Sequence, residues 1–299
     1  REGLVVGQLR EIPPLAAREA IVNGVAHREW GVAEPTVVEH VGRTLRVTSP
    51  GGFVGGVTSE NILSHPSKSR NRALTDLLAS LRVAEREGLG VDRMMREMIA
   101  VGHEPPDIRD IGGPYVRAAL VGDNVDLAWM AWPAEVMPGP ERSDLHSLMI
   151  LRSLVVHGWI DVHTVSALIQ LTVEEARGAI SVVAGLSVGS RSVLKTVAGV
   201  PKGAEAAWRL ASPAKELLIR LDESVGRSRA WPDRSTVAAS YAAARGRISS
   251  SELAGLVKAQ SSNVGSVLRA LEDEGVLEPS RPNRRGQGFY YRFTGAAGS

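Results

Sequence analysis

PPLAAREAIVNGVAHREW, residues 13–30, is the stretch that decides how the front of the chain folds. Its two leading prolines suit the first turn of a helix, where a backbone N–H would be unpaired in any case. Glu19, Asn23 and His27 recur every fourth residue, so they share one polar stripe of the predicted helix. Such a stripe on an otherwise apolar helix is costly to bury unless it binds something. The alternative is the solvated edge of a surface helix, which the spacing alone favours.

Three further motifs follow in order: SPGGF at 49–53, SKSRN at 67–71 and EREGLGVDRM at 85–94. Glycines in the first motif let a backbone approach a ligand, although glycine pairs also mark plain turns. In the second, an arginine and an asparagine could face phosphates or cap the following helix. In the third, a glycine-rich turn before a helix exposes N–H groups that suit phosphate, a weak signal by itself. The methionines that follow it are better explained as core than as a cofactor site.

Together the four motifs, over about residues 1–120, resemble the ATP-binding module of bacterial RecG-like, Schlafen AlbA-associated transcriptional regulators. That module is similar to the GHKL ATPases. The resemblance implies an α/β sandwich that binds ATP and magnesium. It places Glu19 where the GHKL acid polarises water, and Asn23 where an amide holds magnesium. The implied cofactor contacts are Asn23, His27, Gly51, Gly52, Arg70, Asn71, Gly88 and Gly90. The Asp-x-Gly-x-Gly box of the wider clan is missing, so we expect ATP binding rather than efficient hydrolysis.

Composition excludes several classes of protein. Lys and Arg number 35 against 33 Asp and Glu, a net charge of +2, so nucleic-acid binding must depend on local patches. Cysteine is absent, which excludes disulfides and thiolate metal sites and fits a reducing cytoplasm. No apolar run approaches the roughly 20 residues of a membrane span. We therefore expect a cytoplasmic protein with no membrane segment.

The domain organisation follows from turn signals and from a repeated order of elements. PAEVMPGPE has three prolines and one glycine in nine residues, which predicts a linker within 131–142 after a first domain at 1–130. An order of helix, strand, helix, helix and hairpin, typical of a winged helix, is then predicted twice, at 143–212 and at 230–295. A helical connector at 213–229 joins the two. The expected fold class is α+β, with a GHKL-like α/β sandwich followed by two winged-helix (helix-turn-helix) domains.

The second winged helix is the expected DNA reader. The third helix of such a unit enters the major groove, where small polar residues and arginine can reach base edges. Cations at the wing tip suit phosphate or the minor groove. The alternative is a solvated helix face and a basic loop without a ligand. The predicted contacts are Ser261, Ser262, Asn263, Ser266 and Arg269 on the helix, and Arg281, Arg284 and Arg285 on the wing.

The first winged helix offers acids where DNA phosphates would lie, since Glu174 and Glu175 open its third helix. We expect it to serve dimerisation or packing. The most favoured function is a bacterial transcriptional regulator that binds double-stranded DNA as a homodimer under control of an adenine nucleotide. An ATPase associated with DNA and a dimerisation scaffold without a nucleotide are the alternatives. Because the chain begins with Arg1, we also expect a preceding domain, which by the resemblance would be Schlafen AlbA-like.

Overall fold

The computed structural model describes residues 11–83, 89–136, 144–283 and 288–295. They form a mixed α+β protein with several small antiparallel sheets, which confirms the predicted fold class at that level. The chain divides into two compact units. The first comprises residues 1–134, 138–148 and 169–171, and the second comprises 135–137, 149–168 and 172–299. Within the described ranges, no helix has the length and apolar character needed to cross a membrane.

The first unit contains a four-stranded antiparallel sheet in the order β1-β2-β4-β3. Its strands are β1 (Val37–Val41), β2 (Thr44–Pro50), β3 (Asp107–Asp110) and β4 (Tyr115–Val121). β1 and β2 pair from Val41↔Thr44 to Val37↔Thr48 around Gly42 and so form a hairpin. Gly42 has φ +59°, a left-handed backbone conformation that tight turns require and that glycine adopts most easily.

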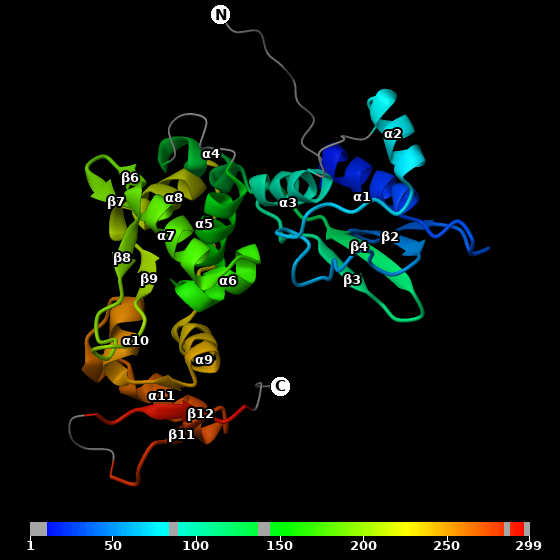
Figure 1. Cartoon of the computed structure of the whole chain (residues 1–299). Coiled ribbons are helices and arrows are strands. Elements are labelled where there is room, and N and C mark those ends of the chain that lie inside the picture. The colour runs from blue at the N-terminus through cyan, green and yellow to red at the C-terminus, as the bar shows by residue number, and fades with distance from the viewer. Residues whose placement is uncertain (1–10, 84–88, 137–143, 284–287, 296–299) are drawn as a thin grey trace, which may run out of the picture. The chain divides into compact units, whose positions relative to one another are not determined.

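Helices α1 (Pro14–Ala26) and α3 (Gly90–Ala100) cover one face of this sheet (Figure 1). None of the residues of α2 (Arg72–Ser80) is itself buried. Small side chains of α1 and methionines of α3 meet the sheet, so the prediction that the methionines are core is confirmed. The core cluster consists of Ala16, Ala20, Leu45, Val47, Met94, Met98 and Leu120. α1 ends at Ala26 and not at Trp30, a residue that is 53% exposed and whose ring lies 4.5 Å from the guanidinium of Arg28.

A helix replaces the first half of the predicted linker. α4 (Leu127–Val136) continues through Pro133, so the expectation of a linker from residue 131 is wrong for 131–136, and residues 137–143 lie outside the described ranges. The cause is burial: Trp129 and Trp132 are fully buried and stack with ring centroids 5.7 Å apart. The Trp129 indole also donates to the Ile99 carbonyl at 2.6 Å. Burying two indoles outweighs the helix-breaking tendency of one proline.

The rest of the chain repeats one order of elements. The first series is α5 (Leu145–His157), β5 (Ile160–Asp161), α6 (Val162–Ile169), α7 (Val173–Gly185), β8 (Leu194–Thr196) and β9 (Ala207–Leu210), with a small extra hairpin of β6 (Ser187–Val188) and β7 (Arg191–Ser192). After α8 (Ser212–Ser224), the second series is α9 (Arg234–Arg245), β10 (Arg247–Ile248), α10 (Ser250–Val257), η2 (Ser261–Asn263), α11 (Gly265–Asp273), β11 (Leu277–Pro279) and β12 (Tyr291–Phe293). Each series contains a three-stranded sheet, in the order β5-β9-β8 in the first and β10-β12-β11 in the second.

Polar side chains cap the helix starts in this region. Thr172 and Ser249 each form a reciprocal capping box with the glutamate three residues later. Asp161 accepts from the N–H of Thr164 at 2.9 Å, as expected for an N-cap. One predicted helix is divided, because residues 261–263 form a 3-10 turn and α11 starts only at Gly265. Serine and asparagine bond locally in place of helix bonds, and glycine is a poor helix former.

Candidate functional site

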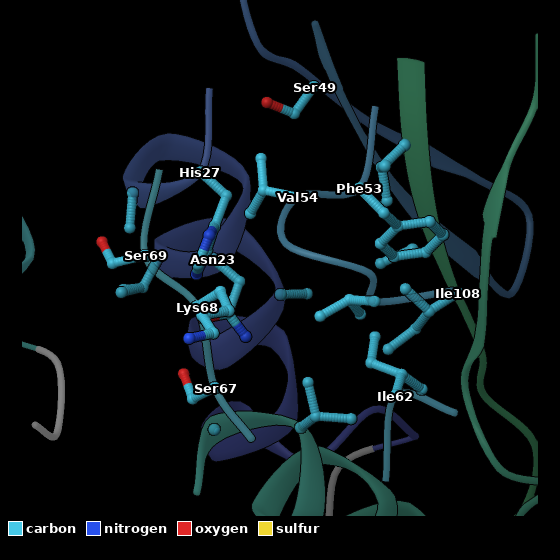
Figure 2. Close-up of a pocket in the computed structure, with 18 of the residues that line it drawn as sticks. Asn23, His27, Ser49, Phe53, Val54, Ile62, Ser67, Lys68, Ser69 and Ile108 are labelled. Carbon is cyan, nitrogen blue, oxygen red and sulfur yellow. The ribbon is translucent and has the colours of Figure 1, made fainter. Parts of the chain in front are cut away.

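A pocket of about 200 Å³ opens in the first unit between α1, the sheet and the segment that precedes α2 (Figure 2). Its lining comes from several elements of the first unit. These are α1, the end of β2 with the loop that follows it, residues 65–69, the start of α3, and the strands β3 and β4. Six residues predicted from the sequence are in its lining: Glu19, Asn23, His27, Gly51, Gly52 and Gly90. Gly88 lies outside the described residues, and Arg70 and Asn71 are not part of the lining.

One side of the pocket is polar. Asn23 projects from α1 and His27 directly follows that helix, and Ser67, Lys68 and Ser69 lie on the same side (Figure 2). The helical period explains the first two, because residues four apart occupy one face. Ser69 Oγ lies 2.7 Å from Thr75 Oγ1 at the start of α2, which fixes the end of this segment. The polar stripe of the sequence therefore faces a pocket and not open solvent.

The opposite side is apolar. Phe53 and Val54 follow the glycine pair, Ile62 comes from the next loop, and Ile108 comes from β3 (Figure 2). Phe53 ends the SPGGF motif, but none of the four was predicted as a site residue, because isolated apolar residues carry no period that identifies them. A flat apolar group such as a nucleobase would find its contacts on this side.

Glu19 is the one carboxylate among the described lining residues, and it is 4% exposed. Its Oε1 lies 3.4 Å from Nη1 of Arg93 on α3, an ion pair that compensates the buried charge. α3 can come this close because it begins with glycine: a Cβ on Gly90 would lie 2.8 Å from Glu19 Oε2 and 3.2 Å from Asn23 Nδ2. The glycine predicted as a phosphate contact thus also serves helix packing.

Arg70 fixes the loop after β2. Its guanidinium donates to the carbonyl of His27 at 3.0 Å, to Glu29 Oε2 at 2.8 Å and to the carbonyl of Gly52 at 2.6 Å. The Gly51 N–H is likewise used, in a bond to the Pro114 carbonyl at 2.5 Å. Arg70, predicted to face phosphate, is thereby committed to holding the wall of the pocket.

Asn71 closes the end of α1. Its Nδ2 donates to the carbonyls of Ala26 and Arg28 at 2.9 and 2.7 Å, two groups that a helix end leaves without partners. It makes no side-chain cap for α2, so that alternative is wrong. The amide is satisfied by the C-terminal end of a different helix.

His27 is neutral near pH 7. Burial lowers the pKa of its imidazole below 6.5, and the nearby positive charge of Arg70 lowers the pKa further. A neutral imidazole offers one donor and one acceptor and adds no charge to the polar side of the pocket.

A dedicated metal site is absent from the described residues, because no group of three or more His, Asp, Glu or Cys side chains comes together there. Within the pocket, Asn23 has a carbonyl oxygen suited to a hard cation, but the neighbouring carboxylate of Glu19 is paired with Arg93. These residues suit a magnesium ion that arrives with ligand phosphates, and not one held by the protein alone.

The predicted DNA contacts lie in the second unit. Ser261, Ser262 and Asn263 are exposed on the 3-10 turn, and Ser266 and Arg269 are exposed on α11. The opposite side of that element is buried, as the period predicts, through Val264, Leu268 and Leu271. Arg281 is exposed after β11, with its Nε donating to the Asn283 carbonyl. Arg284 and Arg285 lie outside the described residues.

Comparison with known proteins supports the resemblance for part of the chain. Residues 38–119 match the protein family described as "Putative ATP-dependent DNA helicase recG C-terminal". This confirms the predicted family for that stretch, which includes most of the sheet, α2, α3 and most of the pocket but not α1. A search of curated proteins found no match.

One solved structure similar to this chain is the crystal structure of the DIP2311 protein from Corynebacterium diphtheriae. The two share 28% sequence identity, with a TM-score of 0.76. The likeness covers 96% of this chain and 51% of the other, so the chain spans about half the length of that relative.

Proposed function

We propose that this chain is a DNA-binding transcriptional regulator whose first unit binds an adenine nucleotide. The observation that carries the proposal is the pocket itself, with a polar side on α1 and residues 67–69 and an apolar side at Phe53 and Ile108. A nucleotide has the same two-sided chemistry, with an apolar base and charged phosphates. Most of the lining falls in the stretch that matches a family described as ATP-dependent. The α/β fold of the first unit would then be a GHKL-like sandwich.

The state of Glu19 favours binding over turnover. A carboxylate that is buried and paired with Arg93 is poorly placed to accept a proton from water. No Asp-x-Gly-x-Gly box supplies a second acid. A nucleotide-borne magnesium would contact Asn23 and the ligand phosphates, and it would neutralise charge there. We therefore propose a binding module in place of an efficient ATPase, and release of inorganic phosphate above background would contradict this part.

The DNA half of the proposal depends on the repeated order of elements. Helix, strand, helix, helix and hairpin is the order of a winged helix, and in the second copy the exposed side of α11 is polar, with Arg269. In the first copy, Glu174 and Glu175 open α7, and Arg177 pairs with both Glu174 and Glu205. Its acidic helix start disfavours phosphate. We propose that the first copy supports the second, and that a homodimer binds a two-fold symmetric site.

The nucleotide half is tested by thermal unfolding of the full chain with and without Mg-ATP. A ligand that binds the folded state raises the unfolding temperature with concentration, by about 2.7 kcal/mol of stability at one hundred times Kd. Asn23→Ala should reduce this shift, whereas Asn124→Ala, an exposed asparagine of the same unit, should leave it unchanged. Absence of any shift for the unaltered chain would overturn the nucleotide proposal.

The DNA half is tested by selecting oligonucleotides bound by the chain with and without ATP, then measuring their affinity across salt concentrations. Arg284→Ala with Arg285→Ala should lower the slope of log K against log salt by about 2, since each lost phosphate contact contributes about 0.9. Arg220→Ala, an exposed position on α8, is the control. An unchanged slope in the double variant would remove the wing from the interface.

A further inference from the structure

We infer that Lys68 is the contact for the anionic end of the ligand, so that the pocket selects phosphorylated nucleosides over nucleosides. The inference deepens the proposed nucleotide site and rests on it. The SKSRN motif predicts Arg70 and Asn71 as the contacts, but the side chains of both are bonded to other protein groups. The side chain that enters the lining between Ser67 and Ser69 is the lysine (Figure 2).

The stem of Lys68 lies beside Gly55 in the loop after β2. A Cβ added to Gly55 would lie 2.7 Å from Lys68 Cγ and 3.1 Å from Lys68 Cβ, so the lysine occupies the space that the glycine leaves free. Gly55 also has φ +64°, a backbone conformation that favours glycine. Lys68 as a whole is exposed, so its methylenes lie beside Gly55 while its ammonium stays in contact with water, the usual arrangement of an amphipathic side chain.

The charges around the pocket leave this ammonium without a carboxylate in the described structure. Arg93 compensates Glu19, and Glu29 compensates Arg70. His27 contributes no positive charge, because burial lowers its pKa. No described Asp or Glu pairs with Lys68, and Glu19 is the one acid in the described lining. The polar side of the pocket therefore presents one uncompensated positive charge.

The neighbours of Lys68 identify the class of anion. Asn23, with an amide donor, and Ser67, with a hydroxyl, line the same side, so an anion with several oxygen atoms would find several donors. An ammonium is a compact point charge that binds phosphate from varied directions. A phosphoryl group satisfies these donors while the base contacts Phe53 and Ile108 across the pocket.

The test is calorimetric titration of the full chain with ATP and with adenosine. The unaltered chain should bind ATP at least about tenfold more tightly than adenosine, and Lys68→Gln should lose about tenfold in ATP affinity while adenosine binding stays the same. Lys202→Gln, an exposed lysine of the second unit, should behave as the unaltered chain. Equal unfolding temperatures without ligand establish that the variants are folded.

The outcomes separate the two proposals. If the unaltered chain binds ATP and Lys68→Gln binds it equally well, the lysine assignment is wrong and the nucleotide site stands. If neither ATP nor adenosine binds the unaltered chain, the nucleotide site is wrong, and the lysine assignment fails with it.

A chemical measurement gives an independent readout. Lys68 is the only lysine among residues 1–194, so acylation by an amine-reactive ester reports on it without ambiguity in peptide mapping. Saturating ATP should slow its acylation about tenfold, whereas Lys202 should react at the same rate with and without ATP. An unchanged acylation rate of Lys68 under saturating ATP would contradict the assignment.

Discussion

Gly51 shows how one residue shapes the pocket wall. Its φ is +97°, and an added Cβ would lie 2.9 Å from Glu29 Cβ and 3.1 Å from Arg70 Cζ. Gly51→Ala should therefore destabilise the chain through backbone strain and through displacement of the Glu29–Arg70 pair, with each contribution about 1–3 kcal/mol. Denaturant unfolding measures the total.

Gly112→Ala is the matched control for the previous substitution. Gly112 has a similar φ of +84°, but an added Cβ would meet nothing within 4 Å. It isolates the cost of the backbone conformation, so the excess loss in Gly51→Ala measures the packing contribution. Equal losses in both variants would show that the Arg70 contacts do not restrict this position.

His27 should make the stability of the first unit depend on pH. Burial and Arg70 lower its pKa in the folded state below 6.5, so below that pH the unfolded chain binds more protons than the folded one. Protonation of His27 therefore has no effect on the free energy of unfolding above about pH 7. As the pH falls through 6.5 toward the folded pKa, it lowers that free energy progressively. In His27→Gln, the loss of stability between pH 7 and 5 should be smaller. A pH dependence as steep as that of the unaltered chain would contradict the assignment, and exposed His40→Gln is the control.

At the scale of elements, the C-terminal end of α1 depends on one amide from a distant segment. Asn71→Ala leaves the carbonyls of Ala26 and Arg28 without this donor, which should cost about 1–3 kcal/mol in chemical unfolding. Because α1 carries Asn23 and is directly followed by His27, nucleotide affinity should fall as well. Asn124→Ala removes an exposed amide and should change neither quantity. Unchanged stability in Asn71→Ala would show that water replaces the amide.

Elements defined by local pattern were predictable from the sequence. The β1–β2 hairpin follows from alternation around Gly42, and the starts of α7 and α10 follow from Thr172 and Ser249. α4 was not predictable, because Pro133 signals a break, whereas the burial of Trp132 is a tertiary effect. Local sequence carries the turn chemistry, but it does not reveal which side chains a distant element will cover.

The candidate site was predictable in the same uneven way. The stripe of Glu19, Asn23 and His27 follows from helical spacing, and all three line the pocket. Within SKSRN the choice between cations was not predictable, because it depends on where Glu29 and Gly55 lie in space. Arg70 has a carboxylate within reach and Lys68 has none among the described residues, a difference that residue types alone do not show.

At the scale of the whole molecule, the second unit is held together by contacts between its two repeats. Trp159 and Tyr241 meet edge to face at 4.8 Å, and the Trp159 indole donates to Ser240 Oγ at 3.0 Å. Beside them Arg245 Nη1 lies 2.8 Å from Asp161 Oδ2, with side chains only 11% and 4% exposed. The two repeats therefore share a core contact and a buried ion pair.

Arg245→Met should destabilise the second unit by about 3–5 kcal/mol, because it leaves the buried carboxylate of Asp161 without its cation. The unfolding transition measured by calorimetry should also broaden or split into two transitions if the two repeats lose their coupling. Arg220→Met, an exposed arginine on α8, is the control and should change stability by less than about 0.5 kcal/mol. A loss equal to that of the control would show that the ion pair does not couple the repeats.

Control of DNA binding by a nucleotide requires that the ligand bind two conformations with different affinity. Residues 65–72 are the segment that we propose to respond, because they include both Lys68, which lines the pocket, and Arg70, which fixes the loop after β2. Closure on a phosphate would move both sets of contacts together.

The central claim is that the pocket between α1 and residues 67–69 holds an adenine nucleotide, and a crystal structure of the chain grown with ATP tests it most directly. We predict density for the base beside Phe53 and Ile108, and for the phosphates beside Lys68 and Asn23. A pocket filled by its own side chains at saturating ATP, or a nucleotide bound elsewhere on the chain, would contradict the claim.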